Sequence, residues 1–177
     1  EFKNNFTNSF KEGDRIVVIG SIFGGTGSSG IPKIVAAIRN HNNTNIKNAE
    51  ISVVLVLPYF AVKTPQQGEI SIKSNIFNSK TKAALNYYES SGTNREINNI
   101  YYVGDKVPTM VEPHIGDKEQ KNNAHIVEMI SAMSVLHVMT NTPNPNKGTK
   151  YKFNACADIT NGIGLNELVG ESETQWS

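Results

Sequence analysis

A stretch rich in glycine and hydroxyl residues, Gly20–Gly30 (GSIFGGTGSSG), contains the residue types that bind phosphate. It follows the apolar run Arg15–Ile19 and leads into the apolar segment Ile31–Ile38, which predicts the order strand, glycine loop, helix. Glycines permit positive φ angles and let an anion approach the backbone closely. The helix that follows directs its unpaired N–H groups and the positive end of its dipole at that anion.

Six residues of this stretch are the predicted phosphate ligands: Gly24, Gly25, Thr26, Gly27, Ser28 and Ser29. The hydroxyls can donate to phosphate oxygens or cap the helix. Pro32 fits the first turn of that helix, where its missing N–H costs nothing. A tight turn can use glycine for packing alone, but glycines interleaved with hydroxyl residues exceed what a turn needs. We therefore predict a phosphate or nucleotide site.

The composition limits the class of protein. A hydrophobic content of 38% fits a soluble protein with a core, and no apolar run approaches the ~20 residues of a membrane span. A net charge of +1 leaves no uncompensated basic stripe for nucleic acid. The single cysteine, Cys156, excludes an internal disulfide and is best interpreted as a small core residue. We expect a cytoplasmic protein without a membrane or nucleic-acid partner.

Strands and helices are expected to alternate along the chain. Continuous β-branched or apolar runs predict buried strands at Asp14–Ile19, Ile51–Leu57 and Asn99–Val103. Helical patterns are expected at Ile31–Arg39, Asn78–Ser90 and Asn122–Met139. This alternation predicts an α/β fold: a three-layer, Rossmann-like domain with a mostly parallel sheet and right-handed crossovers. The last helix is apolar on nearly all sides, so we expect a long, deeply buried helix.

The remaining segments are expected to be less regular. The residues before Lys11 predict an irregular lead-in or the tail of an earlier element, and the polar residues 41–45 and 106–121 predict loops. Beyond the breaker segment 142–148, a strand over Tyr151–Ile159 and a short helix or tail over Leu165–Ser177 are expected. The predicted division is a nucleotide-binding α/β domain over residues 1–140, then a linker and the start of a following segment over 141–177.

The order of elements and the motif Gly24–Ser28 (GGTGS) resemble the nucleotide-binding domain of the tubulin/FtsZ superfamily. The resemblance covers roughly Asp14 to Met139, and Leu57–Phe60 stands where the bacterial cell-division member carries Lys-Pro-Phe. It implies binding of GTP or GDP, with Mg²⁺ arriving on the phosphates, and association into an oligomer or filament. It also implies that Asn122 or Asn123 reads the guanine edge.

The sequence departs from that family in three respects. Phe23 stands where the family has a small residue, and Ser29 stands where it has glycine. The family's earlier glycine loop is absent, which we interpret as the sign of a fragment of a longer protein. The family's catalytic acids come from the loop after the long helix, but no Asp or Glu lies between Glu128 and Asp158. We therefore expect no GTP hydrolysis by this chain alone.

Besides the binding of GTP or GDP, an NAD(P)-binding domain and a scaffold domain remain open as the second and third possible functions. An NAD(P)-binding Rossmann domain needs an acidic residue at the tip of its second strand, whereas here Glu50 precedes that strand and Pro58 follows it. A Walker-type loop is weaker still, because no Gly-Lys-Ser/Thr follows the glycines. The third possibility is a scaffold or assembly domain that keeps the fold without turnover.

The histidines and one aspartate complete the candidate residues. His137 lies on the long apolar helix and is interpreted as a satisfied core residue. His125 stands beside the two candidate asparagines and could stack or hydrogen-bond near a nucleotide. Asp105 follows the third strand and is interpreted as a turn aspartate, with a contact to ribose or metal as the alternative. No pair of histidines has supported metal-ligand spacing, so no protein metal cage is predicted.

Overall fold

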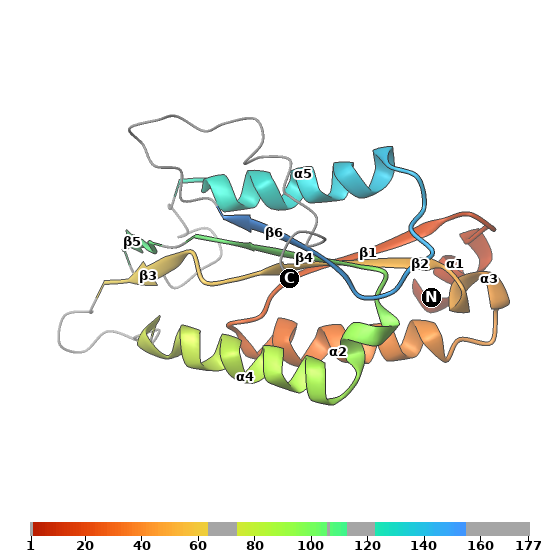
Figure 1. Ribbon diagram of the computed structural model, residues 1–177, viewed down its shortest axis with the longest axis horizontal. Coiled ribbons are helices and arrows are strands. Elements are labelled where there is room, and N and C mark those ends of the chain that lie inside the picture. The colour runs from red at the N-terminus through yellow and green to blue at the C-terminus, as the bar shows by residue number, and fades with distance from the viewer. Residues whose placement is uncertain (1, 64–73, 106, 113–122, 155–177) are drawn as a thin grey trace.

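The computed structural model describes residues 2–63, 74–105, 107–112 and 123–154. Four parallel strands form the central sheet (Figure 1). In spatial order they are β1 (Arg15–Ser21), β2 (Glu50–Val56), β4 (Asn99–Gly104) and β6 (Thr149–Asn154). The predicted α/β class with a mostly parallel sheet is confirmed, and the three expected strands are present with small shifts of their ends.

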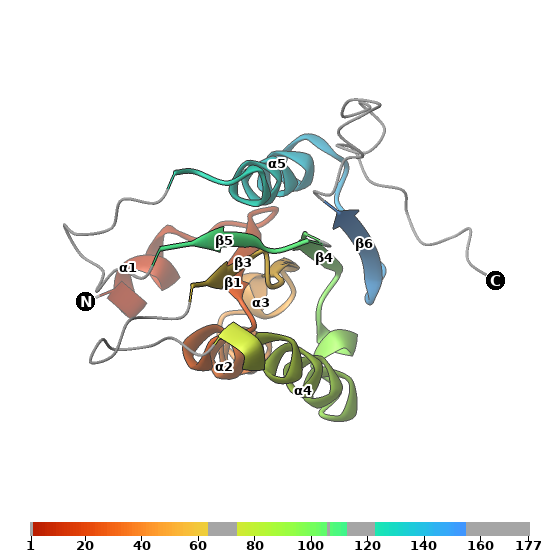
Figure 2. The same cartoon turned by 90° about the vertical axis from the view of Figure 1, so that its left-hand side faces the viewer.

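Three long helices cover the two faces of the sheet (Figure 2). Helices α2 (Gly25–Arg39) and α4 (Phe77–Ser90) lie on one face, and α5 (Ile126–Thr140) lies on the other. The three long helices run back against the direction of the strands, so all three begin at the end of the sheet where the strands finish (Figure 1). We name this end the carboxyl edge and the opposite end the amino edge.

Short elements fill the connections. They are α1 (Phe2–Ser9), α3 (Thr44–Lys47), the 3₁₀ turns η1 (Ser74–Ile76) and η2 (Thr93–Glu96), and a small parallel pair, β3 (Phe60–Val62) with β5 (Thr109–Val111). The residues of α1 were predicted as an irregular lead-in or the tail of an earlier element, the first residues of α3 were predicted as a loop, and neither β3 nor β5 was predicted. The predicted strand Tyr151–Ile159 is present as β6 up to Asn154. Cys156, Asp158 and the segment 165–177 lie outside the described residues.

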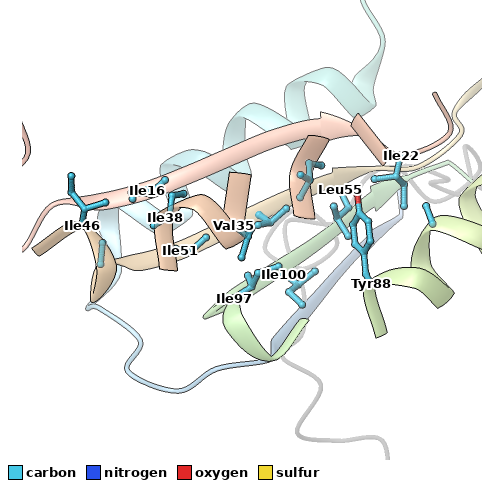
Figure 3. Packing of buried hydrophobic residues seen from close by; sticks show 14 residues of the cluster. Ile16, Ile22, Val35, Ile38, Ile46, Ile51, Leu55, Tyr88, Ile97 and Ile100 are labelled. Atoms are coloured by element: carbon cyan, nitrogen blue, oxygen red, sulfur yellow. The ribbon is translucent and has the colours of Figure 1, made fainter. Parts of the chain in front are cut away.

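Each face of the sheet has its own apolar core. Alternation along β2 places Val53 and Leu55 in the core against α2 and α4, shown in Figure 3, and Val54 in the core against α5. The β2 strand is buried on both faces, which explains why its sequence is apolar without alternation. Within the described residues, no helix is long and apolar enough to cross a membrane.

Helix α5 differs from its prediction in two respects. It begins at Ile126, not Asn122. It is also not buried on nearly all sides, because Met129, Leu136 and Met139 are 48%, 58% and 69% exposed. The buried residues recur at helical spacing along one face: Val127, Ile130, Ser131, Ser134 and Val138. The sheet covers that face alone, and no described element covers the outer one.

Two arginines bind backbone carbonyl groups at the amino edge. Arg39 donates to the carbonyls of Lys47 and Ala49 at 2.9 and 2.7 Å. Arg15 donates to the carbonyl of Val138 and, at 2.8 Å, to that of Asn141, where α5 ends. These bonds fasten the carboxyl end of α5 and the start of β2 to the same end of the sheet.

Candidate functional site

A backbone contact fixes the junction between β1 and α2. Only residues 22–24 separate the strand from the helix. A Cβ atom placed on Gly27 would lie 1.9 Å from the carbonyl oxygen of Ser21, so position 27 must be glycine at this distance. This is close packing of a helix on a strand. None of the glycines from Gly20 to Gly30 has a positive φ, so the predicted use of that conformation here is wrong.

The second part of the stretch predicted as a glycine loop, Gly25–Gly30, instead forms the beginning of α2, whereas Gly20 and Ser21 end β1. Two serines stabilise the first turns of α2: Ser28 Oγ donates to the Gly24 carbonyl at 2.6 Å, and Ser29 Oγ donates to the Gly25 carbonyl at 2.8 Å. Pro32 is therefore inside the helix, not in its first turn as predicted. The hydroxyls of Ser28 and Ser29 are bound to the helix backbone, not turned outward toward a phosphate.

The first turn of α2 nevertheless has the properties of an anion site. The N–H groups of Gly25, Thr26 and Gly27 precede the first intrahelical bond, and Gly24 at the N-cap has no side chain to bond them. The first turn contains no acidic residue. A Cβ atom on Gly25 would meet nothing within 4 Å, and Thr26 is exposed. An anion therefore has access to three N–H donors and one hydroxyl at the carboxyl edge.

A pocket of about 340 Å³ lies on the α5 side of the same edge. Its walls include Tyr59, Phe60, Asn123, His125 and Glu128. Of the two predicted base-reading residues, Asn123 therefore lines a pocket, whereas Asn122 lies outside the described residues. None of the six predicted phosphate ligands lines this pocket. The two halves of the predicted site thus start from opposite faces of the sheet.

Phe23 connects the glycine turn to the end of β2. Its buried ring lies 6.4 Å from the ring of Tyr59 and 5.6 Å from that of Phe60, both edge-on. On its other side it packs 4.9 Å from Phe77 at the start of α4. The bulky residue that departs from the tubulin/FtsZ pattern therefore anchors the glycine turn in an aromatic cluster beside the pocket.

His125 caps α5 and fixes the wall of the pocket. Its Nδ1 accepts from the N–H of Val127 at 3.2 Å, so its Nε2–H is available to donate to Thr109 Oγ1 at 2.9 Å. Glu128 completes a capping box by accepting from the His125 N–H. The histidine followed three residues later by glutamate was the sequence signal for this start, and it was missed. Asn123 consequently precedes the cap instead of opening the helix.

Tyr59 adds an aromatic wall to the pocket. Its ring lies 4.9 Å from that of His125, and its hydroxyl donates to Glu128 Oε1 at 3.1 Å. Burial, with a further contribution from Glu128, raises the pKa of Tyr59 to about 12. The hydroxyl is therefore protonated at neutral pH and keeps Glu128 in place.

Asp105 has its predicted role as a turn aspartate, and His137 is satisfied as predicted but is half-buried and not part of the apolar core. Asp105 Oδ1 accepts from the Val107 N–H at 3.1 Å, as a turn aspartate does, while its Oδ2 lies 3.9 Å from His125 Nε2. His137 is bonded by both ring nitrogens, to Tyr101 at 2.8 Å and Asn141 at 2.7 Å, and burial lowers its pKa. Among the described residues, no three His, Cys, Asp or Glu side chains gather as a metal site.

Comparison with known proteins gives no match to a protein family, a curated protein or a solved structure.

The glycines of α2 predict opposite responses to the same substitution. Gly27→Ala forces α2 off β1 because its Cβ would overlap the Ser21 carbonyl. We expect a loss of roughly 2 kcal/mol or more in the free energy of unfolding, as for other overpacked sites. Gly30→Ala meets nothing within 4 Å, so it should be neutral or stabilise the helix by up to about 1 kcal/mol. Urea unfolding of both variants checks this, and equal effects would contradict the close contact.

Proposed function

We propose that this chain binds a purine nucleotide, GTP or GDP, at the carboxyl edge of its sheet. The phosphates would bind the first turn of α2 and the base the pocket beside α5. The observation that carries the proposal is the first turn of α2, with exposed N–H groups and open space at Gly25. Ligands of open α/β sheets bind outside the carboxyl ends of the strands, where this turn lies.

The pocket beside α5 suits a base. Its volume of about 340 Å³ is near the lower end of the range for small-molecule sites. Asn123 offers an amide donor and an acceptor, which match the edge of guanine, and the rings of Tyr59 and His125 offer a stacking surface. The resemblance of Gly24–Ser28 to the tubulin/FtsZ signature supports the same choice. Mg²⁺ would be bound chiefly through the phosphates.

The NAD(P) alternative receives less support. The carboxylate nearest β2 in sequence, Glu50, begins that strand and therefore lies at the amino edge. There it accepts from Asn99 Nδ2 at 2.6 Å and pairs with Arg15 at 3.5 Å. At the other end of β2, Pro58 and Tyr59 occupy the place where a dinucleotide site needs an acid.

Binding is proposed without hydrolysis by this chain alone. Residues 141–148, which follow α5, lie at the amino edge, where the Asn144 carbonyl accepts from Asn98 Nδ2 at 2.9 Å. The first turn of α2 lies at the opposite end of the sheet. Within one chain these residues are therefore too far from bound phosphates to position a water molecule for attack.

A scaffold that self-associates is the second candidate, and the outer face of α5 favours it. Met129, Ala132, Leu136 and Met139 form an exposed stripe at the spacing of a helix–helix contact. No Asp, Glu, Lys or Arg occurs from Met129 to Asn146. The stripe is nearly symmetric about Ser134, so an antiparallel second copy would place Met129 against Met139 of the other chain. We propose that a second copy covers this face.

The phosphate half of the site is tested with two valine variants. Gly25→Val adds a branched side chain that points beyond the helix N-terminus, toward the anion and away from other protein atoms. We expect GTP affinity to fall at least tenfold while the fold is retained. Gly30→Val, one turn farther along and also in open space, should bind as the parent does. Calorimetric titration decides, and parental affinity in Gly25→Val would contradict the phosphate site.

The base half is tested with Asn123→Ala, titrated with GTP, ATP and NAD. Loss of the amide should weaken GTP more than ATP, by about 1–3 kcal/mol for a buried hydrogen bond. Equal loss for both purines would refute base reading by Asn123. Tighter binding of NAD than of GTP by the parent chain would instead support the dinucleotide alternative.

Self-association is tested on the outer face of α5. Leu136→Glu with Met139→Glu places charges on the stripe, so sedimentation should show a fully monomeric protein where the parent dimerises. Ile34→Glu, at an exposed isoleucine of α2 that is 47% accessible, is the control and should dimerise as the parent does. A parent chain that stays monomeric at high concentration would refute the proposal that a second copy covers α5.

A further inference from the structure

Pro32 leaves one carbonyl of α2 without its helical partner. It is the eighth residue of the helix, and proline has no N–H for the carbonyl four residues before it. That carbonyl belongs to Ser28. The three glycines before Pro32, at positions 25, 27 and 30, further weaken the helix there, since glycine is a poor helix former.

Tyr88 from α4 supplies a donor at this point. Its hydroxyl lies 3.0 Å from the Ser28 carbonyl and 3.2 Å from that of Gly27. The side chain is 0% exposed and stands in the core beside Leu55 and Ile22, with its hydroxyl at the end remote from α4 (Figure 3). Burial raises the pKa of Tyr88 to about 12, so the hydroxyl keeps its proton at neutral pH.

We propose that Tyr88 is a positioning residue of the phosphate site, whose hydroxyl replaces the amide that Pro32 lacks. The bond fastens α2 to α4 across the turns that precede Pro32. Those turns carry the N–H groups of Gly25, Thr26 and Gly27, so Tyr88 sets the direction in which these donors point. The part of this inference that concerns a ligand rests on the proposed nucleotide function. The replacement of the amide by the hydroxyl does not.

The replacement is tested by a double-mutant cycle of Tyr88→Phe and Pro32→Ala. Hydrogen exchange of the amides of residues 28–31, which begin the helical ladder, is the readout. Tyr88→Phe should speed this exchange about three- to tenfold, as expected for the loss of one hydrogen bond. In the Pro32→Ala background the same change should have little effect, because alanine restores the N–H that the Ser28 carbonyl lacks. Tyr87→Phe, on the exposed neighbour, is the control and should change nothing.

The ligand part is tested by titrating GTP into the same variants. Tyr88→Phe should lower the affinity about three- to tenfold, and the double variant should recover most of it. Faster exchange with unchanged affinity would overturn the positioning role. Equal exchange effects in both backgrounds, or none, would overturn the replacement of the amide. A parent chain that binds no GTP would refute the proposed function and the ligand part, while the exchange cycle would still decide the structural part.

Discussion

The backbone contact between Gly27 and Ser21 is the constraint on which the candidate site depends. α2 packs so closely against β1 that no Cβ atom fits at position 27. Only three residues separate the end of β1 from the start of α2. A larger residue at position 27 would lift the helix and remove its first turn from the carboxyl edge. Phe23, held between Phe60 and Phe77, fixes the same junction from the side.

The polar groups around the start of α2 divide into two sets. One set holds the helix: the hydroxyls of Ser28, Ser29 and Tyr88 are all bonded to backbone carbonyls of its first two turns. The other set, the N–H groups before the first intrahelical bond, remains accessible. The serines of the motif are therefore structural, and only its backbone N–H groups and Thr26 are left to contact a ligand. A motif alone does not separate these two uses of the same residue types.

The fold was largely predictable from the sequence because buried parallel strands give continuous apolar runs, as in β2. The start of α2 was not predictable, because Gly25–Gly30 has poor helix propensity and packs against Ser21 of β1 and against Tyr88, which is distant from it in sequence. The prediction that the outer face of α5 is buried was wrong. An apolar sequence shows that a helix face can be buried, but it does not show whether another element covers that face.

The candidate site was also predictable only in part from the sequence. The candidate phosphate ligands were predicted from residue type and spacing, and Asn123 was predicted from the resemblance to the tubulin/FtsZ superfamily; the start of α2 and Asn123 both lie at the carboxyl edge. The aromatic cluster of Phe23, Tyr59 and Phe77 was not predicted as a unit, since it joins three separate segments of the chain. Short strands such as β3, with three residues, carry too little pattern to be recognised in a sequence.

The parallel arrangement of the three long helices gives this nearly neutral protein a net helix dipole along the strands. Helices α2, α4 and α5 all begin at the carboxyl edge (Figure 1), so their dipoles add instead of cancelling. At the amino edge, Arg15 and Arg39 place positive charge against backbone carbonyls, including those at the end of α5. The first turn of α2 has no acid in the matching position. The arginines offset the negative helix ends at the amino edge, whereas no acid in the first turn of α2 offsets its positive end, so the start of α2 keeps a local attraction for an anion although the formal net charge is only +1.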